Sequence, residues 1–188
     1  MSEFFPVRWP EDPTPNNEQN CKDCGLYKHG SRMIWGEGNP NARIMILLDN
    51  PGARKDRDGN PFVCGTRQTL QKAAYKVGLT MDNLYVTYIL KRKPTRKYDK
   101  QETRHICMKH LDEQLKKVQP TLIFCMGNVS VQSFFDDAKV DVKSLRGQWH
   151  DVRGISTTVA YHPLAVRRRP NLWNAFLEDF QLAASRLS

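Results

Sequence analysis

The stretch RIMILLDNPG, residues 43–52, decides the fold of this chain. Residues 43–48 are mostly apolar, which is typical of a short strand buried in a sheet. Asp-Asn-Pro-Gly follows directly and is a strong turn signal. Asp49 is therefore expected at the carboxyl end of a buried strand, and ligands of open α/β sheets bind at that edge. The alternative is that Asp49 only begins the turn, as Asp often does.

Further predicted strands and helices follow along the chain. Three more apolar runs are expected as strands and lie at residues 84–90, 121–126 and 156–161. Helical patterns separate them and lie near residues 66–78, 101–118 and 128–135, with a last helix from about residue 171. Strands that alternate with helices predict an α/β fold, a three-layer α/β/α sandwich with a four-stranded parallel sheet.

The composition sets outer bounds on the function. At 188 residues the chain suits one domain at 21–188, and residues 1–20, with four prolines, are expected to form an extended arm before it. The net charge of +9 favours a polyanionic partner such as DNA; the alternative is a basic surface with no partner. We expect neither a membrane span nor a signal peptide, because no apolar run has the required length.

Polar side chains stand at the ends of three predicted strands. Asp49 follows the first, Tyr88 lies near the end of the second and His162 follows the fourth. Parallel strands place these ends on one edge, so the three side chains are expected to converge there. Pro163 keeps His162 out of helical conformation and directs its ring toward that edge. The alternative is an ordinary core or surface histidine.

Two basic segments are predicted at the same end of the sheet. They are expected to bind DNA through Lys91, Arg92, Lys93 and Arg96 in one loop, and Val166, Arg167, Arg168 and Arg169 in the other. Arginines beside apolar residues suit a loop that neutralises phosphates and presses into a groove. Solvated charge runs without a partner are the alternative.

The five cysteines favour metal ligands or reduced thiols over disulfides, since their number is odd. Cys21 and Cys24 have ligand spacing, and Cys107 and His110 lie one turn apart on one face of a predicted helix. Together they make a Cys3His zinc set. The same residues suit an iron–sulfur cluster less well, because four thiolates are the rule there.

Several ordered motifs resemble those of the uracil-DNA glycosylase superfamily, and most of all its family 4, the iron–sulfur type of bacteria and archaea. The resemblance covers residues 21–180 and rests on Cys21 with Cys24, Gly36 to Pro40, Leu48 to Gly52, Gly59 to Phe62, Tyr88 to Pro94, Cys107, Leu145 to Gly147 and His162 with Pro163. It implies a monomeric enzyme that acts on DNA in the cytoplasm of a prokaryote, at the nucleoid. It also implies a [4Fe-4S] cluster, with structural zinc as the alternative.

The resemblance further implies how the site works. Phe62 stacks on a base that is flipped out of the helix, in a pocket formed with Asn50, Pro51, Gly52 and Tyr88. His162 stabilises the departing base, and Asp49 orients a water or stabilises the cationic sugar. No lysine stands at either motif, so simple hydrolysis to an abasic site is expected.

Three positions depart from the family pattern. Asp49 replaces a glutamate, Tyr88 replaces the asparagine that reads uracil, and Arg92 replaces the third cluster cysteine. A phenol cannot offer the paired donor and acceptor of an amide. Three interpretations therefore stay open: a uracil-DNA glycosylase in DNA repair, a glycosylase for a bulkier modified pyrimidine of phage DNA in antiviral defence, or a non-catalytic DNA-binding module.

Overall fold

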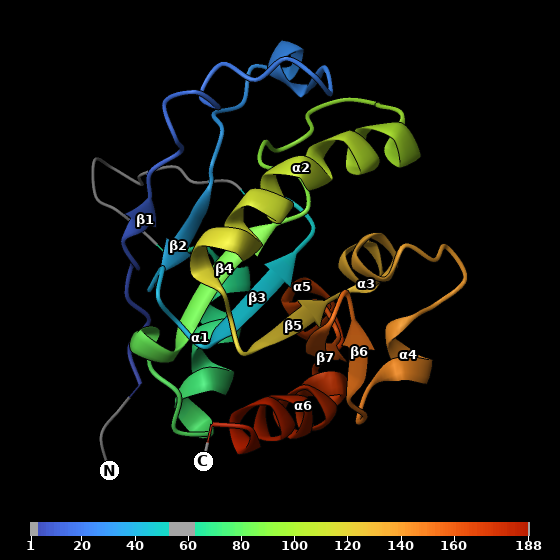
Figure 1. Ribbon diagram of the computed structural model, residues 1–188. Coiled ribbons are helices and arrows are strands. Elements are labelled where there is room, and N and C mark those ends of the chain that lie inside the picture. Colours follow the sequence, from blue (N-terminus) through green and yellow to red (C-terminus); the bar gives the residue numbers. More distant parts are fainter. Residues whose placement is uncertain (1–3, 53–62, 188) are drawn as a thin grey trace.

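The computed structural model describes residues 4–52 and 63–187, which fold around one seven-stranded sheet (Figure 1). The strands follow the order β1-β2-β4-β3-β5-β7-β6. Their bounds are Glu11–Asp12 for β1, Gly36–Gly38 for β2, Ile44–Leu48 for β3, Leu84–Tyr88 for β4, Leu122–Met126 for β5, His150–Val152 for β6 and Ile155–Ala160 for β7. The central strands β4, β3, β5 and β7 are parallel, which confirms the predicted core.

The sheet is larger than the predicted four strands. Strands β1, β2 and β6 extend its two edges and pair antiparallel to their neighbours. Each has only two or three residues and none is an apolar run, so the sequence carries no periodic signal for them.

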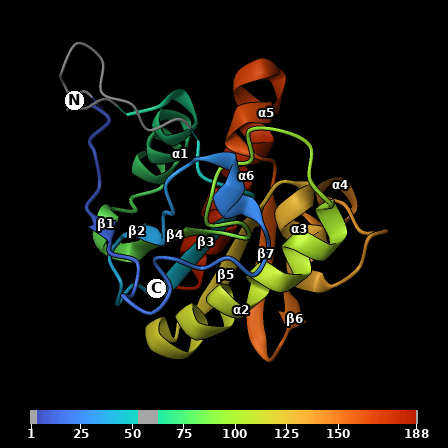
Figure 2. The ribbon, with the colours of Figure 1, turned by 90° about the horizontal axis from the view of Figure 1, so that it is seen from above.

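The described residues form six α-helices, and these cover both faces of the sheet. Their bounds are Gly65–Lys76 for α1, Lys100–Val118 for α2, Asn128–Phe135 for α3, Val142–Leu145 for α4, Pro163–Arg168 for α5 and Trp173–Ser185 for α6. Helices α1, α5 and α6 lie on one face, and α2, α3 and α4 on the other (Figure 2). The predicted α/β/α sandwich is therefore confirmed. No helix within the described ranges is long and apolar enough to cross a membrane.

Strand β3 is buried by both helical layers. Ile44, Ile46 and Leu48 belong to the core under α1, α5 and α6, whereas Met45 and Leu47 belong to the core under α2 and α3. None of these five side chains is more than 2% exposed. Burial on both faces explains why the strand is a continuous apolar run and not an alternating one.

The segment after His162 differs from its prediction as a loop. Pro163 begins helix α5, with His162 in extended conformation as the N-cap. The backbone N–H at the first position of a helix has no partner within the helix, so proline, which lacks this N–H, is well suited to that position. Pro163 therefore begins a helix and not a loop. Arg167 and Arg168 consequently lie on a helix.

Candidate active site and candidate metal centre

The structure joins the ends of β3 and β7 by a hydrogen bond between Asp49 and His162. Nδ1 of His162 accepts the backbone N–H of Leu164 at 3.0 Å. A neutral imidazole that accepts at one nitrogen carries its proton on the other. Nε2 therefore donates to Oδ1 of Asp49, at 3.0 Å. The helix that His162 caps thus fixes which ring nitrogen faces the carboxylate.

Burial and hydrogen bonding act on Asp49 in opposite directions. Burial disfavours the charged carboxylate, but the hydrogen bond that the polar imidazole of His162 donates and the backbone N–H of Asn50, at 2.8 Å, outweigh it. The pKa of Asp49 consequently lies below its ordinary value. A carboxylate that is charged at neutral pH can orient a water or face a developing cation.

The lack of a side chain at Gly127 leaves room for His162 to reach Asp49. Strand β5 lies between β3 and β7, and Gly127 directly follows it. A Cβ on this glycine would come within 2.9 Å of the His162 Cβ, and its φ of +89° is one that other residues rarely adopt. The contact between Asp49 and His162 therefore requires glycine at the end of β5.

Asp49 and His162 open into a cavity of about 340 Å³. Of the residues predicted for a base pocket, Asn50, Gly52 and Tyr88 line it, whereas Pro51 is buried and is not part of its wall. Phe62, predicted to stack on a base, lies outside the described residues.

Sequence reasoning missed a buried ionic network in the wall of this cavity. Arg67 on α1 pairs with Glu37 on β2 and donates to the phenol oxygen of Tyr88. All three line the cavity and are at most 8% exposed. An arginine in the first turn of a helix is ordinarily a surface residue, so only the arrangement of β2, β4 and α1 reveals the pair.

Two residues predicted to contact DNA are buried, and the prediction is wrong for both. Lys91 is 1% exposed because its ammonium group donates to Thr87 Oγ1, to the Tyr88 carbonyl and to Gln114 Oε1. Burial lowers its pKa to about 7. Val166 lies in the core beneath α5, and the exposed apolar residue of that helix is Leu164, which lines the cavity.

The other predicted DNA contacts differ in their surroundings. Arg92 is half-buried and donates to the carbonyls of Ser31 and Gln19. Lys93 lines the cavity, and Arg96 donates to the backbone carbonyl of Lys28. Exposed positions on and after α5 are held by Arg167, Arg168 and Arg169.

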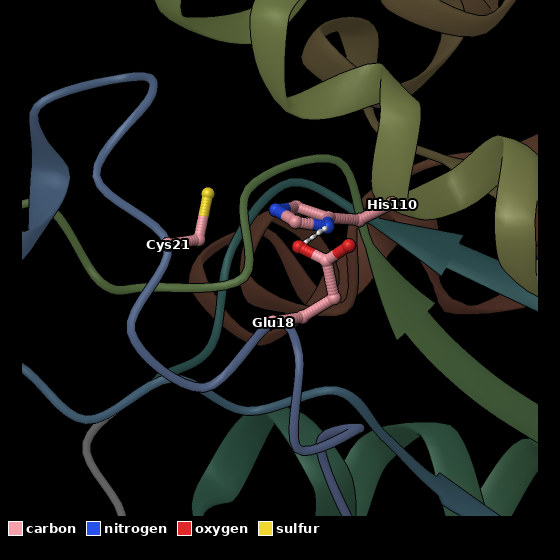
Figure 3. Close-up of side chains that lie close together, drawn as sticks. All are labelled: Glu18, Cys21 and His110. Carbon is pink, nitrogen blue, oxygen red and sulfur yellow. Dashed lines mark ion pairs between the residues drawn. The ribbon is translucent and has the colours of Figure 1, made fainter.

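The predicted metal ligands form two groups. Ligand atoms of Cys21, His110 and a residue missed by sequence reasoning, Glu18, all lie within 4.8 Å of one another (Figure 3). Cys24 instead shares a hydrogen bond with Cys107, which lowers the Cys24 pKa to about 6. Glu18 could not be found from spacing, because no cysteine or histidine repeat points to it.

His110 has the character of a ligand. It is 1% exposed, and burial, aided by nearby Lys91, lowers its pKa to about 4, so the ring is neutral. Its Nδ1 has no hydrogen-bond partner among the described residues and lies 3.5 Å from Oε2 of Glu18. A neutral imidazole nitrogen, a carboxylate and a thiol that lie this close together can act as ligands to one cation.

Comparisons with known proteins agree with this fold. A model of the uracil DNA glycosylase superfamily matches residues 35–183. The Type-4 uracil-DNA glycosylase of Archaeoglobus fulgidus is 29% identical over 86% of this chain and 85% of its own length. The Type-4 enzyme of Sulfurisphaera tokodaii is 30% identical over 86% and 78%. A DNA polymerase of Bacillus phage SP01 is 24% identical over 86% of this chain and 18% of the polymerase.

The fold and the site define a DNA N-glycosylase, an enzyme that cleaves the bond between a base and its sugar. The chain belongs to the uracil DNA glycosylase superfamily, and the resemblance stated from its motifs is confirmed.

A four-thiolate iron–sulfur cluster does not fit the described residues. In the resemblance to family 4, Arg92 takes the place of one of the four cysteines, and its guanidinium donates to the Ser31 carbonyl at 2.7 Å. A guanidinium has no lone pair to give a metal. The donors that remain are mixed in chemistry, with thiols, an imidazole and a carboxylate.

Alanine substitutions at Gly127 and at a second glycine can distinguish the backbone conformation of Gly127 from its close contact with His162. We expect Gly127→Ala to push His162 away from Asp49 and to shift the NMR signal of the His162 Nε2 proton. Gly154→Ala is the matched control, since that glycine also has positive φ, +78°, but has no atom within 4 Å of an added Cβ. Gly154→Ala should lose roughly 1–2 kcal/mol in urea unfolding, and Gly127→Ala should lose more, because the contact with His162 adds to the backbone cost. An unchanged Nε2 signal in Gly127→Ala would contradict the close-approach argument.

Proposed function

We propose that this chain is a monofunctional DNA glycosylase that flips out a non-canonical pyrimidine and hydrolyses its N-glycosidic bond, leaving an abasic site. The hydrogen-bonded pair of Asp49 and His162 at the mouth of the cavity carries the proposal. We also propose that residues 21–188 form the glycosylase domain of a monomer, and that residues 1–20 form an arm that is packed onto this domain through Trp9 and β1.

In the proposed reaction the bond between C1′ and the base nitrogen breaks, and its electron pair leaves with the base. The Asp49 carboxylate faces the cationic sugar and takes a proton from the water that attacks C1′. The Nε2 proton of His162 turns from Asp49 to the departing base and stabilises its negative charge. The base is protonated by solvent after it leaves.

Positive charge near the cavity supports binding of the phosphate backbone. Lys93 lines the cavity, and Arg167, Arg168 and Arg169 are exposed. Leu164, exposed between the cavity and these arginines, is placed to fill the space left by a flipped base.

Two observations bear on the base. The Type-4 relatives are named for uracil, which favours uracil and a role in repair. The pair of Tyr88 with Arg67 favours a second candidate, a bulkier pyrimidine modified at C5, as in phage DNA, with a role in antiviral defence. Tyr88 stands where an amide would read uracil, and a guanidinium beside it suits oxygen-rich substituents.

Asp49→Asn should abolish base release and leave folding and DNA affinity nearly intact. The amide keeps the size of the carboxylate and its acceptor for His162 but loses the charge, which is needed most in the transition state. We expect a fall of at least roughly 100- to 1,000-fold. The measurement is alkaline cleavage of abasic sites in oligonucleotides that carry uracil or 5-modified pyrimidines.

Asp112→Asn is the matched control, because Asp112 is exposed and pairs with Arg153 away from the cavity. It should retain full activity. Full activity in Asp49→Asn would contradict the assignment. Unaltered protein that binds these DNAs but releases no base would support a non-catalytic module on the same fold.

Tyr88→Asn should increase release of uracil relative to modified bases, since the amide offers uracil a donor and an acceptor together. Tyr88→Phe is the control, because it removes the hydroxyl without adding an amide. Relative kcat/KM values for uracil and 5-hydroxymethyluracil in one oligonucleotide measure the change. Equal base preference in the two variants would show that Tyr88 does not set the base.

We further propose that Glu18, Cys21 and His110 hold one structural zinc ion, with the thiols of Cys24 and Cys107 beside it. Zinc accepts mixed nitrogen, sulfur and oxygen ligands, whereas clusters need thiolates. The ion would connect residues 18–21 to α2. It would take no part in the reaction.

Metal analysis and a visible spectrum of fresh protein test the proposed ion. We expect about one zinc per chain, no colour, and loss of metal in His110→Ala, since a structural site needs its full set of ligands. His105→Ala, an exposed histidine on the same helix, should keep the metal. Brown protein that contains iron would contradict zinc, and protein with neither metal would remove the site.

A further inference from the structure

The N-terminal segment reaches the cavity from outside the matched family region. The superfamily model begins at residue 35, yet Val7, Arg8 and Trp9 line the same cavity as Asp49 and His162. The segment passes α1 and continues into β1 at the edge of the sheet (Figure 2). One wall of the pocket is therefore built by residues that the catalytic motifs do not include.

Gln71 of α1 holds this segment by a pair of hydrogen bonds. Its Oε1 accepts the backbone N–H of Val7 at 2.9 Å, and its Nε2 donates to the Val7 carbonyl at 2.6 Å. Gln71 is 5% exposed, so both bonds are shielded from water. A side-chain amide that satisfies both backbone groups of one residue fixes the position of that residue, as a neighbouring strand would.

The residues after Val7 are fastened to the core. Trp9 is buried within the core beneath α1 and α6, and its ring lies 3.5 Å from the position of a Cβ on Gly38. The Pro10 carbonyl accepts the N–H of Gly38 at 3.0 Å. Val7 directly precedes these anchors and is itself 56% exposed.

We propose that Val7 to Trp9 form a specificity wall for the flipped base and that Gln71 is its positioning residue. This inference rests on the proposed function. Trp9 and Gln71 keep the backbone in place, and Val7 lines the cavity that the flipped base would enter. The wall selects a pyrimidine by the size of its substituent, because a pocket discriminates by about 10- to 200-fold for one methylene group.

Two variants test the wall from opposite directions. Val7→Phe places a larger side chain beside the cavity. Because Val7 is exposed, the variant should still fold. It should weaken binding of 5-hydroxymethyluracil relative to uracil by about tenfold. Gln71→Ala releases the segment and should shift the same ratio toward the larger base. Gln132→Ala is the matched control, since its amide bonds the Val140 carbonyl at 3.1 Å, away from the cavity.

Binding is measured by fluorescence anisotropy in the Asp49→Asn background, with oligonucleotides that differ only in the base. This readout needs no base release, so its outcome is separate from that of the proposed chemistry. The inference is supported if Val7→Phe and Gln71→Ala move the ratio of Kd values in opposite directions while Gln132→Ala leaves it unchanged. It is overturned if both variants leave the ratio within about twofold of the Asp49→Asn parent, a change of less than about 0.5 kcal/mol.

Discussion

The hydrogen bond between His162 and Asp49 is the constraint on which the rest of the site depends. It joins the ends of β3 and β7, which are separated in the sheet by β5. It therefore requires a parallel register that ends the strands at one edge, and a residue without a side chain at Gly127. It also requires the N-cap position of α5, which turns Nε2 toward the carboxylate.

Polar contacts attach residues 18–31 to α2 and to the loop that follows β4. Arg92 donates to two of their carbonyls, Lys109 pairs with Asp23, and His110 meets Glu18. Behind them Lys91 is buried, which is tolerable because three acceptors surround its ammonium group. The hydrogen bonds of Arg92 to the Ser31 and Gln19 carbonyls hold these residues against the loop that follows β4.

The pocket takes its residues from different elements of the fold. Asp49 and His162 stand at the ends of the central strands β3 and β7, whereas Glu37 lies on β2 and Arg67 in the first turn of α1. Buried ion pairs are costly unless their geometry is held, so this pair limits what the pocket can accept. The pair of Asp49 with His162 and the pair of Glu37 with Arg67 thus come from different parts of the structure and line one cavity.

The sequence by itself determined the parallel core of the sheet, the two helical layers, the family and the pair of Asp49 with His162. Apolar runs that end in Asp-Asn-Pro-Gly or His-Pro carry these features locally, and their shared edge follows from parallel pairing. Only the tertiary structure decided the burial of Lys91 and Val166, the network of Glu37 with Arg67, the place of Glu18 beside His110, and the N-terminal wall. These features depend on contacts between segments far apart in the chain, such as that of Lys91 with Gln114, and no local pattern of charge or hydrophobicity encodes which distant group a side chain will meet.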